Sequence, residues 1–178
     1  MPVALRDEDL MTQAIAHAAA TLDALQAIGA TVATAESCTG GLIGHLLTEV
    51  PGASQSFLGA AVVYANAAKE AILGVDSGLL QTHGAVSEPV AQAMADGARQ
   101  RFASSVAVAT SGIAGPDGGT AHKPVGTLCL ALSAAEGSRA WTVHFPGLTR
   151  AAFKRAAADA ALAAVRAWAQ AGHSASPD

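Results

Sequence analysis

The chain has 178 residues, 51% of them hydrophobic, with a formal net charge of −4, six histidines and two cysteines. Its length suits one domain with a sizeable core, and no apolar run is long enough to cross a bilayer. The acidic balance and scattered basic residues argue against duplex nucleic acid as a partner, and the histidines lack the short spacing of zinc ligands.

The N-terminal residues lack the basic and apolar segments of a secretion signal. We therefore expect a cytoplasmic protein whose cysteines are free thiols. We expect one domain over 1–178, with an ordered core over about 9–171 and a flexible tail at 173–178.

The first half of the chain alternates between helical and strand patterns. Apolar residues recur at helical spacing up to Gly29, which is a typical helix terminator. In chain order, the sequence predicts a helix over 9–29, a strand over 31–35, a helix over 41–47, a buried strand over 57–65 and a helix capped by Asn66.

The second half begins with Ser87, which is a predicted N-cap because Pro89 falls in the following first turn. The predicted elements are a helix from there to Phe102, strands over 105–110, 125–133 and 139–145, and a helix over 151–170. A turn at Glu136-Gly137 predicts that the last two strands are antiparallel. This order predicts a three-layer α/β/α sandwich around a mixed, mostly parallel sheet of about five strands.

The first candidate site is the segment Ala35-Glu-Ser-Cys-Thr-Gly-Gly41, where a strand gives way to a helix. Such a turn can direct backbone N–H groups and the positive end of a helix dipole at a phosphate or an oxyanion. Ser37 is the candidate nucleophile, although Ser before a helix is more commonly a cap. Cys38 is the second candidate, because a helix N-terminus lowers the pKa of a thiol.

A second candidate segment contains Tyr64, at the end of a strand, and Lys69, at the third position of the next helix. A lysine there opposes the helix dipole, and the same field together with burial would lower its pKa. Lys69 is therefore a candidate base for Ser37, with Tyr64 passing or steadying the proton. A surface lysine directed to solvent is an equally good interpretation of the spacing.

Two further features could bind a ligand. The glycine-rich loop Ser111-Gly-Ile-Ala-Gly-Pro-Asp-Gly-Gly119 could hold a phosphate with its backbone, or could be a plain turn. Arg150, at the start of the last helix, could bind a carboxylate or phosphate, although an exposed arginine without a ligand is the more common case. Because Ser37, Tyr64 and Ser111 all follow strands, we expect them to meet at the carboxyl edge of the sheet, where ligands usually bind.

Five motifs in order resemble the CinA C-terminal domain family, the nicotinamide-nucleotide amidases. They are Ala35-Glu-Ser-Cys-Thr-Gly-Gly41, Tyr64-x-Asn-x-x-Lys69-x-x-x-Leu-Gly-Val75, His83-Gly-Ala-Val-Ser-Glu88, the loop over 111–119, and Lys123-Pro-Val-Gly-Thr127. The resemblance covers nearly the whole chain. The companion N-terminal domain of longer CinA proteins has no counterpart here, so the chain resembles the stand-alone amidase form.

The resemblance implies hydrolysis of the carboxamide of nicotinamide mononucleotide to nicotinic acid mononucleotide and ammonia, without a metal or cofactor. It implies Ser37 as nucleophile, assisted by Tyr64 and Lys69. Around them, the expected substrate-binding residues are Cys38, Thr39, Gly40, Gly41, Ser111, Gly112, Ala114, Gly115 and Arg150. The resemblance also favours a homo-oligomer, most simply a dimer.

The chain departs from the family pattern at two places. Ala65 replaces a residue that is usually polar, and Gly147-Leu-Thr-Arg150 replaces Gly-Asp-Arg, so that Arg150 matches only if one residue is inserted. Two other functions stay open from the sequence, namely a nucleotide-binding module without turnover and an amidase for a different amide. The phosphate could lie against the loop at Gly112–Gly115 or against Arg150.

Overall fold

The computed structural model describes residues 7–172, so the tail predicted at 173–178 lies outside the described residues. The strands are β1 (Val32–Glu36), β2 (Phe57–Val62), β3 (Val106–Gly112), β4 (Thr127–Ala134) and β5 (Gly137–His144). The helices are α1 (Asp7–Ala27), α2 (Leu42–Thr48), α3 (Asn66–Leu73), α4 (Ser77–His83), α5 (Glu88–Phe102) and α6 (Arg150–Gln170), with a 3₁₀ turn at Ala53–Gln55.

The strands form a single sheet in the order β2-β1-β3-β4-β5. β1 runs parallel to both β2 and β3, because a helix returns the chain to the same end of the sheet before each strand. β4 is antiparallel to β3 and to β5, and a tight turn over residues 135–136 joins β4 to β5. The predicted mixed sheet and its terminal hairpin are thus confirmed, with four of the five described strands pointing the same way.

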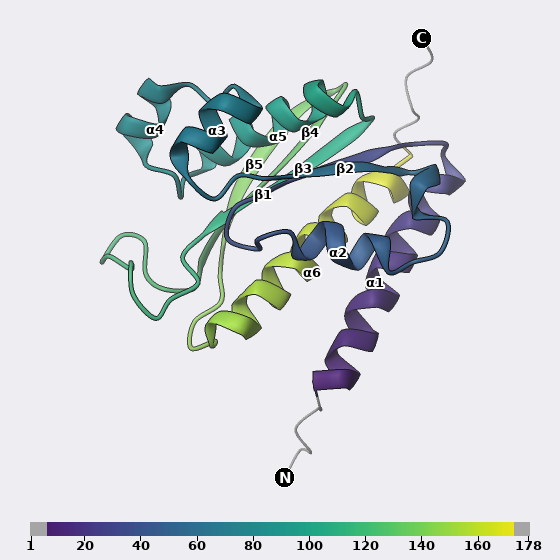
Figure 1. Cartoon of the computed structure of the whole chain (residues 1–178), viewed down its shortest axis with the longest axis horizontal. Helices are drawn as coiled ribbons and strands as arrows, with labels where there is room; N and C mark the ends of the chain where they lie inside the picture. Colours follow the sequence, from purple (N-terminus) through teal and green to yellow (C-terminus); the bar gives the residue numbers. More distant parts are fainter. Residues whose placement is uncertain (1–6, 173–178) are drawn as a thin grey trace.

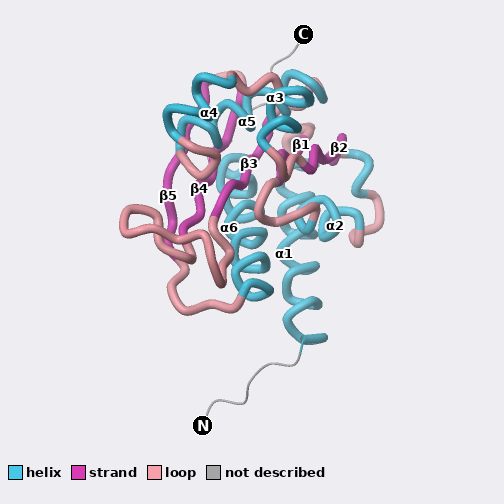
Figure 2. The backbone as a smooth tube through the Cα atoms, turned by 60° about the vertical axis from the view of Figure 1, so that its left-hand side comes forward, coloured by secondary structure: helices cyan, strands magenta, loops and turns pink. Residues whose placement is uncertain are grey.

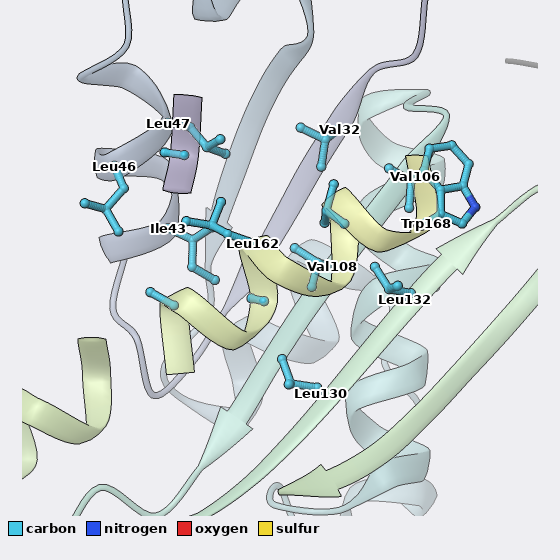
Figure 3. Close-up of a cluster of buried hydrophobic side chains, with 14 of the residues drawn as sticks. Val32, Ile43, Leu46, Leu47, Val106, Val108, Leu130, Leu132, Leu162 and Trp168 are labelled. Carbon is cyan, nitrogen blue, oxygen red and sulfur yellow. The ribbon is translucent and has the colours of Figure 1, made fainter. Parts of the chain in front are cut away.

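Helices cover both faces of the sheet (Figures 1 and 2), as the sequence predicts. α1, α2 and α6 lie on one face, and α3, α4 and α5 lie on the other. Val32 and Val108 of the central strands pack against Leu162 of α6 in the larger core (Figure 3). The opposite core is built largely from alanines of β1 and β3 packed against α5 around Met94. These small side chains leave room for a helix close to the sheet.

The structure corrects two predictions about the segment around β2. The predicted buried strand is an edge strand in which only Ala61 is buried, because β2 has a neighbour on one side alone. Asn66 is not the N-cap of α3: Ala65 occupies that position and its carbonyl accepts the N–H of Lys69, which becomes the fourth helical residue. α4 was not predicted from the sequence.

The parallel strands β1, β2 and β3 end at the same edge of the sheet. Ser37 follows β1, Tyr64 lies two residues beyond β2, and Ser111 is the second-to-last residue of β3. These three residues therefore lie at the carboxyl edge of the sheet, as expected. None of the helices among the described residues is long and apolar enough to span a bilayer.

Candidate active site

Ser37 lies at the sharp turn between β1 and α2. Its backbone N–H donates to the carbonyl of Thr110 at 3.0 Å, which extends the pairing of β1 with β3 by one residue. Strand alternation sends the side chain of Glu36 toward α2 and that of Ser37 toward the α3 layer. Gly40 and Gly41 have φ values of 62° and 91°, a left-handed conformation that lets the chain turn into the helix at once.

Lys69 projects from α3 to the side chain of Ser37 and is completely buried. Its Nζ lies 3.2 Å from Ser37 Oγ, 2.9 Å from the carbonyl oxygen of Val63 and 3.0 Å from that of Tyr64. The two carbonyls belong to the segment that connects β2 to α3, so the backbone beside the lysine fixes its amine. The alternative of a surface lysine directed to solvent is wrong.

The surroundings of Lys69 make loss of its proton easier than in a free lysine. Burial lowers the pKa of Lys69 below its usual value of 10.5, and within the described residues no carboxylate lies within 4 Å of its Nζ. A neutral amine has two N–H donors and one lone pair. In the protonated form Lys69 Nζ donates to Ser37 Oγ as well as to the two carbonyls; in the neutral form, donation to Val63 and Tyr64 would use both donors and leave the lone pair to accept the hydroxyl proton of Ser37. This geometry suits general-base activation of a serine.

Glu36 holds the turn in place, a role that the sequence pattern did not lead us to predict. Its carboxylate is fully buried and accepts hydrogen bonds at 2.7 to 3.2 Å from two threonine hydroxyls and three backbone N–H groups, those of Thr34, Thr39, Gly41, Ile43 and Gly44. It thereby caps the N-terminus of α2 with a negative charge. An acidic residue at the end of a strand and just before a helix was the signal for this role.

Glu36 also changes which backbone groups can act on a substrate. The N–H of Gly41 donates to Glu36 and that of Gly40 to the carbonyl of Ser37, so the expectation that these two groups face an oxyanion is wrong. The N–H groups of Cys38 and Thr39 donate to no acceptor within residues 7–172. They are the remaining candidates in this turn for binding an oxyanion.

The side chains of Cys38 and Thr39 are buried in the interior of the protein. Burial raises the pKa of the Cys38 thiol to about 12, so it stays protonated and is a poor nucleophile at neutral pH. The Thr39 hydroxyl is fully buried and lies 2.9 Å from the hydroxyl of Thr110. Of the two candidate nucleophiles, the structure therefore favours Ser37.

Tyr64 and Arg150 meet beside the turn although 86 residues separate them. One guanidinium nitrogen of Arg150 donates to the Tyr64 hydroxyl at 3.0 Å, and the other donates to the carbonyl of Gly115 at 3.0 Å. The extra residue before Arg150 thus does not displace it from the site. The Tyr64 hydroxyl contacts Arg150 rather than Ser37 or Lys69, whereas the Tyr64 backbone carbonyl accepts a hydrogen bond from Lys69 Nζ, so the prediction that Tyr64 passes or steadies the proton stays a prediction.

The end of β3 and the loop after it lie beside the turn that carries Ser37. The Ser111 hydroxyl donates to the carbonyl of Ala85 at 2.7 Å, and Ala114 is buried in the core. At Gly112 a β-carbon would lie 2.7 Å from the carbonyl oxygen of Thr127, so only glycine fits. Ser111, Gly112 and Ala114 therefore make contacts within the protein, whereas the carbonyl of Gly115 accepts a hydrogen bond from Arg150.

The two remaining motifs contact each other through Lys123 and His83. Lys123 Nζ donates to the carbonyl of His83 at 2.8 Å, which ties the segment after the glycine-rich loop to the end of α4. Ser87 is the N-cap of α5 as predicted, but its hydroxyl donates to the carbonyl of Gly84 instead of accepting from the helix.

Comparisons with known proteins agree with this architecture. A CinA-like protein from Synechococcus sp. (strain CC9902) is 51% identical over 140 residues, which are 79% of this chain and 32% of that protein. A putative competence-damage inducible protein from Symbiobacterium thermophilum is 56% identical over 127 residues, covering 71% of this chain and 28% of that one. The chain thus spans about a third or less of the length of these curated relatives.

Solved structures match over nearly the whole chain. The competence/damage inducible protein CihA from Agrobacterium tumefaciens is 38% identical with a TM-score of 0.84, covering 94% of this chain and 98% of that one. A CinA superfamily protein from Escherichia coli is 30% identical with a TM-score of 0.82, covering 96% and 95%. The sequence model of the CinA C-terminal domain matches residues 14–168, and the chain belongs to this family.

Proposed function

We propose that this protein hydrolyses the carboxamide of nicotinamide mononucleotide through an acyl-enzyme on Ser37. The observation that carries the proposal is the contact between Ser37 Oγ and Lys69 Nζ at 3.2 Å, with the lysine buried and its pKa lowered. The choice of substrate rests on the five motifs that resemble the nicotinamide-nucleotide amidases. Family membership and the fold support the proposal without naming the substrate.

In the first half of the reaction, Ser37 Oγ attacks the carboxamide carbon while Lys69 takes the hydroxyl proton. The negative charge of the tetrahedral species develops on the former carbonyl oxygen, where the N–H groups of Cys38 and Thr39 can bind it. One such donor contributes roughly 3 kcal/mol in well-studied hydrolases. The C–N bond then breaks, Lys69 returns its proton to the nitrogen, and ammonia leaves.

In the second half, Lys69 takes a proton from water, and the resulting hydroxide attacks the ester carbon. Nicotinic acid mononucleotide leaves as the carboxylic acid, while Lys69 returns the proton to Ser37 Oγ. Each proton that Lys69 accepts is therefore released again within the same half-reaction. The two carbonyls that hold its amine keep the group aligned throughout.

The test is ammonia release from nicotinamide mononucleotide by wild type, Ser37→Ala and the matched neighbour variant Cys38→Ala. We expect Ser37→Ala to fold, by circular dichroism, and to lose at least about a thousandfold in kcat, because no nucleophile remains. Cys38→Ala should retain activity within about tenfold. Loss in Cys38→Ala with full activity in Ser37→Ala would transfer the nucleophile to the cysteine.

Release by no variant, with nicotinamide mononucleotide still bound, would favour the alternative of a nucleotide-binding module without turnover. A panel of other amides, assayed on the same wild-type preparation, would then separate that module from an amidase of different specificity.

A further inference from the structure

Lys154 of α6 lies against the turn that carries Ser37. A β-carbon on Gly40 would lie 3.5 Å from Lys154 Nζ, so the amine rests on the backbone of this turn in the space that a side chain would fill. Lys154 is half-buried, and within the described part of the chain its amine has no hydrogen-bond acceptor or carboxylate partner. The proposed reaction does not use it.

Arg150 lies four residues earlier and therefore on the same face of α6 as Lys154. Its two contacts, the Tyr64 hydroxyl and the Gly115 carbonyl, are uncharged, so they orient the guanidinium without neutralising it. Among residues 7–172 no carboxylate lies within 4 Å of either cation. The one acidic residue in this turn, Glu36, is enclosed by its own five donors.

Arg150 is exposed and Lys154 is half-buried, so an anion placed between them would be attracted by both cations and would relieve their mutual repulsion. The chain carries 14 acidic and 10 basic residues, so carboxylates are plentiful, yet none is placed here. The glycine-rich loop and Arg150, which the sequence leaves as separate candidates, meet at the carbonyl of Gly115. The loop and Arg150 therefore belong to one candidate phosphate-binding site rather than to two.

We propose that Lys154 and Arg150 together bind the phosphate of the substrate. Lys154 would contact the phosphate from the side of Gly40. This inference rests on the proposed amidase function for the identity of the substrate. A phosphate monoester carries a charge of about −1.5 to −2 at pH 7, which two cations can balance. The carboxamide then lies at Ser37 and the phosphate at the N-terminal turn of α6.

The first test measures binding of inorganic phosphate by calorimetry, which does not depend on catalysis. Lys154→Met keeps most of the aliphatic chain and removes the charge. Arg166→Met is the matched control, because Arg166 is also half-buried on α6 but lies 12 residues away, about 18 Å along the helix. We expect Lys154→Met to raise the Kd of phosphate about tenfold or more and Arg166→Met to change it less than twofold.

The second test compares hydrolysis of nicotinamide mononucleotide with that of its dephosphorylated nucleoside, nicotinamide riboside. We expect Lys154→Met to raise KM for the nucleotide about tenfold, to change kcat less than threefold, and to leave KM for the nucleoside unchanged. Lys154→Arg should restore the nucleotide KM. Equal effects on both compounds, or an unchanged Kd for phosphate, would overturn the inference.

The two proposals fail separately. If wild type binds phosphate through Lys154 but hydrolyses neither compound, the proposed phosphate site (the anion site) is supported and the proposed amidase function is refuted. If wild type hydrolyses the nucleotide with a KM that is indifferent to Lys154, the amidase stands and the anion site fails. If wild type binds no phosphate, the anion site is refuted whatever the activity.

Discussion

Replacing Glu36 with Gln tests whether the buried carboxylate holds the catalytic turn. The substitution exchanges one oxygen for an NH₂ group of nearly the same size, so packing changes little. One carboxylate oxygen accepts from the Thr34 hydroxyl and the Gly44 N–H, and the other accepts from the Thr39 hydroxyl and from the N–H groups of Gly41 and Ile43. An amide nitrogen can accept none of these bonds.

The smaller loss occurs when the NH₂ group faces Thr34 and Gly44. The threonine hydroxyl can rotate to accept from it, but the N–H of Gly44 is left without an acceptor in a buried place. An unsatisfied buried donor costs about 1–3 kcal/mol, and losing the charge at the N-terminus of α2 costs about 0.3–1 kcal/mol more. Because the cost of burying a charge disappears as well, we expect the free energy of unfolding to fall by about 2 kcal/mol.

Urea unfolding of wild type, Glu36→Gln and Glu70→Gln measures this effect. Glu70 is exposed on α3, so its substitution should change the free energy of unfolding by less than about 0.5 kcal/mol. We also expect kcat of Glu36→Gln to fall more than KM rises, since the carboxylate binds residues of the turn that carries Ser37. A Glu36→Gln protein as stable and active as Glu70→Gln would refute the positioning role.

The remaining predictions concern the lysine and its supporting helix. Activity should rise with pH through a pKa below 10.5, and Lys69→Met should abolish it; a rate that falls from neutral to alkaline pH would exclude the lysine as base. Unfolded Lys69 keeps its proton up to about pH 10.5 whereas folded Lys69 releases it earlier, so the unfolding free energy of wild type relative to Lys69→Met should rise with pH between the two pKa values. Gly97→Ala should lower stability by about 1–3 kcal/mol in thermal or urea unfolding, because its β-carbon would lie 2.1 Å from the carbonyl oxygen of Leu73 at the end of α3; an unchanged transition would contradict this close approach.

Strong local patterns in the sequence predicted most of the elements correctly. The helical spacing of apolar residues before Gly29 and the Ser87-x-Pro89 start of α5 are such patterns. Three polar residues at or just beyond the predicted ends of strands, Ser37, Tyr64 and Ser111, were enough to predict a site at the carboxyl edge, because parallel strands share that edge. These inferences depend only on residues near one another in the chain.

The burial of each side chain and the residues that it contacts could not be predicted in the same way, because both depend on which helices and strands become neighbours. The sequence leaves Lys69 equally suited to the surface and to the interior, whereas α3 packed beside the turn buries it against Ser37. The edge position of β2 exposes most of a strand whose composition predicts burial.

The sequence by itself determined the order of helices and strands, the family, and the residues that could carry the chemistry. Only the tertiary structure decided what each of them contacts. Arg150 reaches Tyr64 across 86 residues, and Lys154 rests on Gly40, because α6 packs beside the turn. Such contacts arise from the packing of distant segments, whose closeness no local propensity encodes.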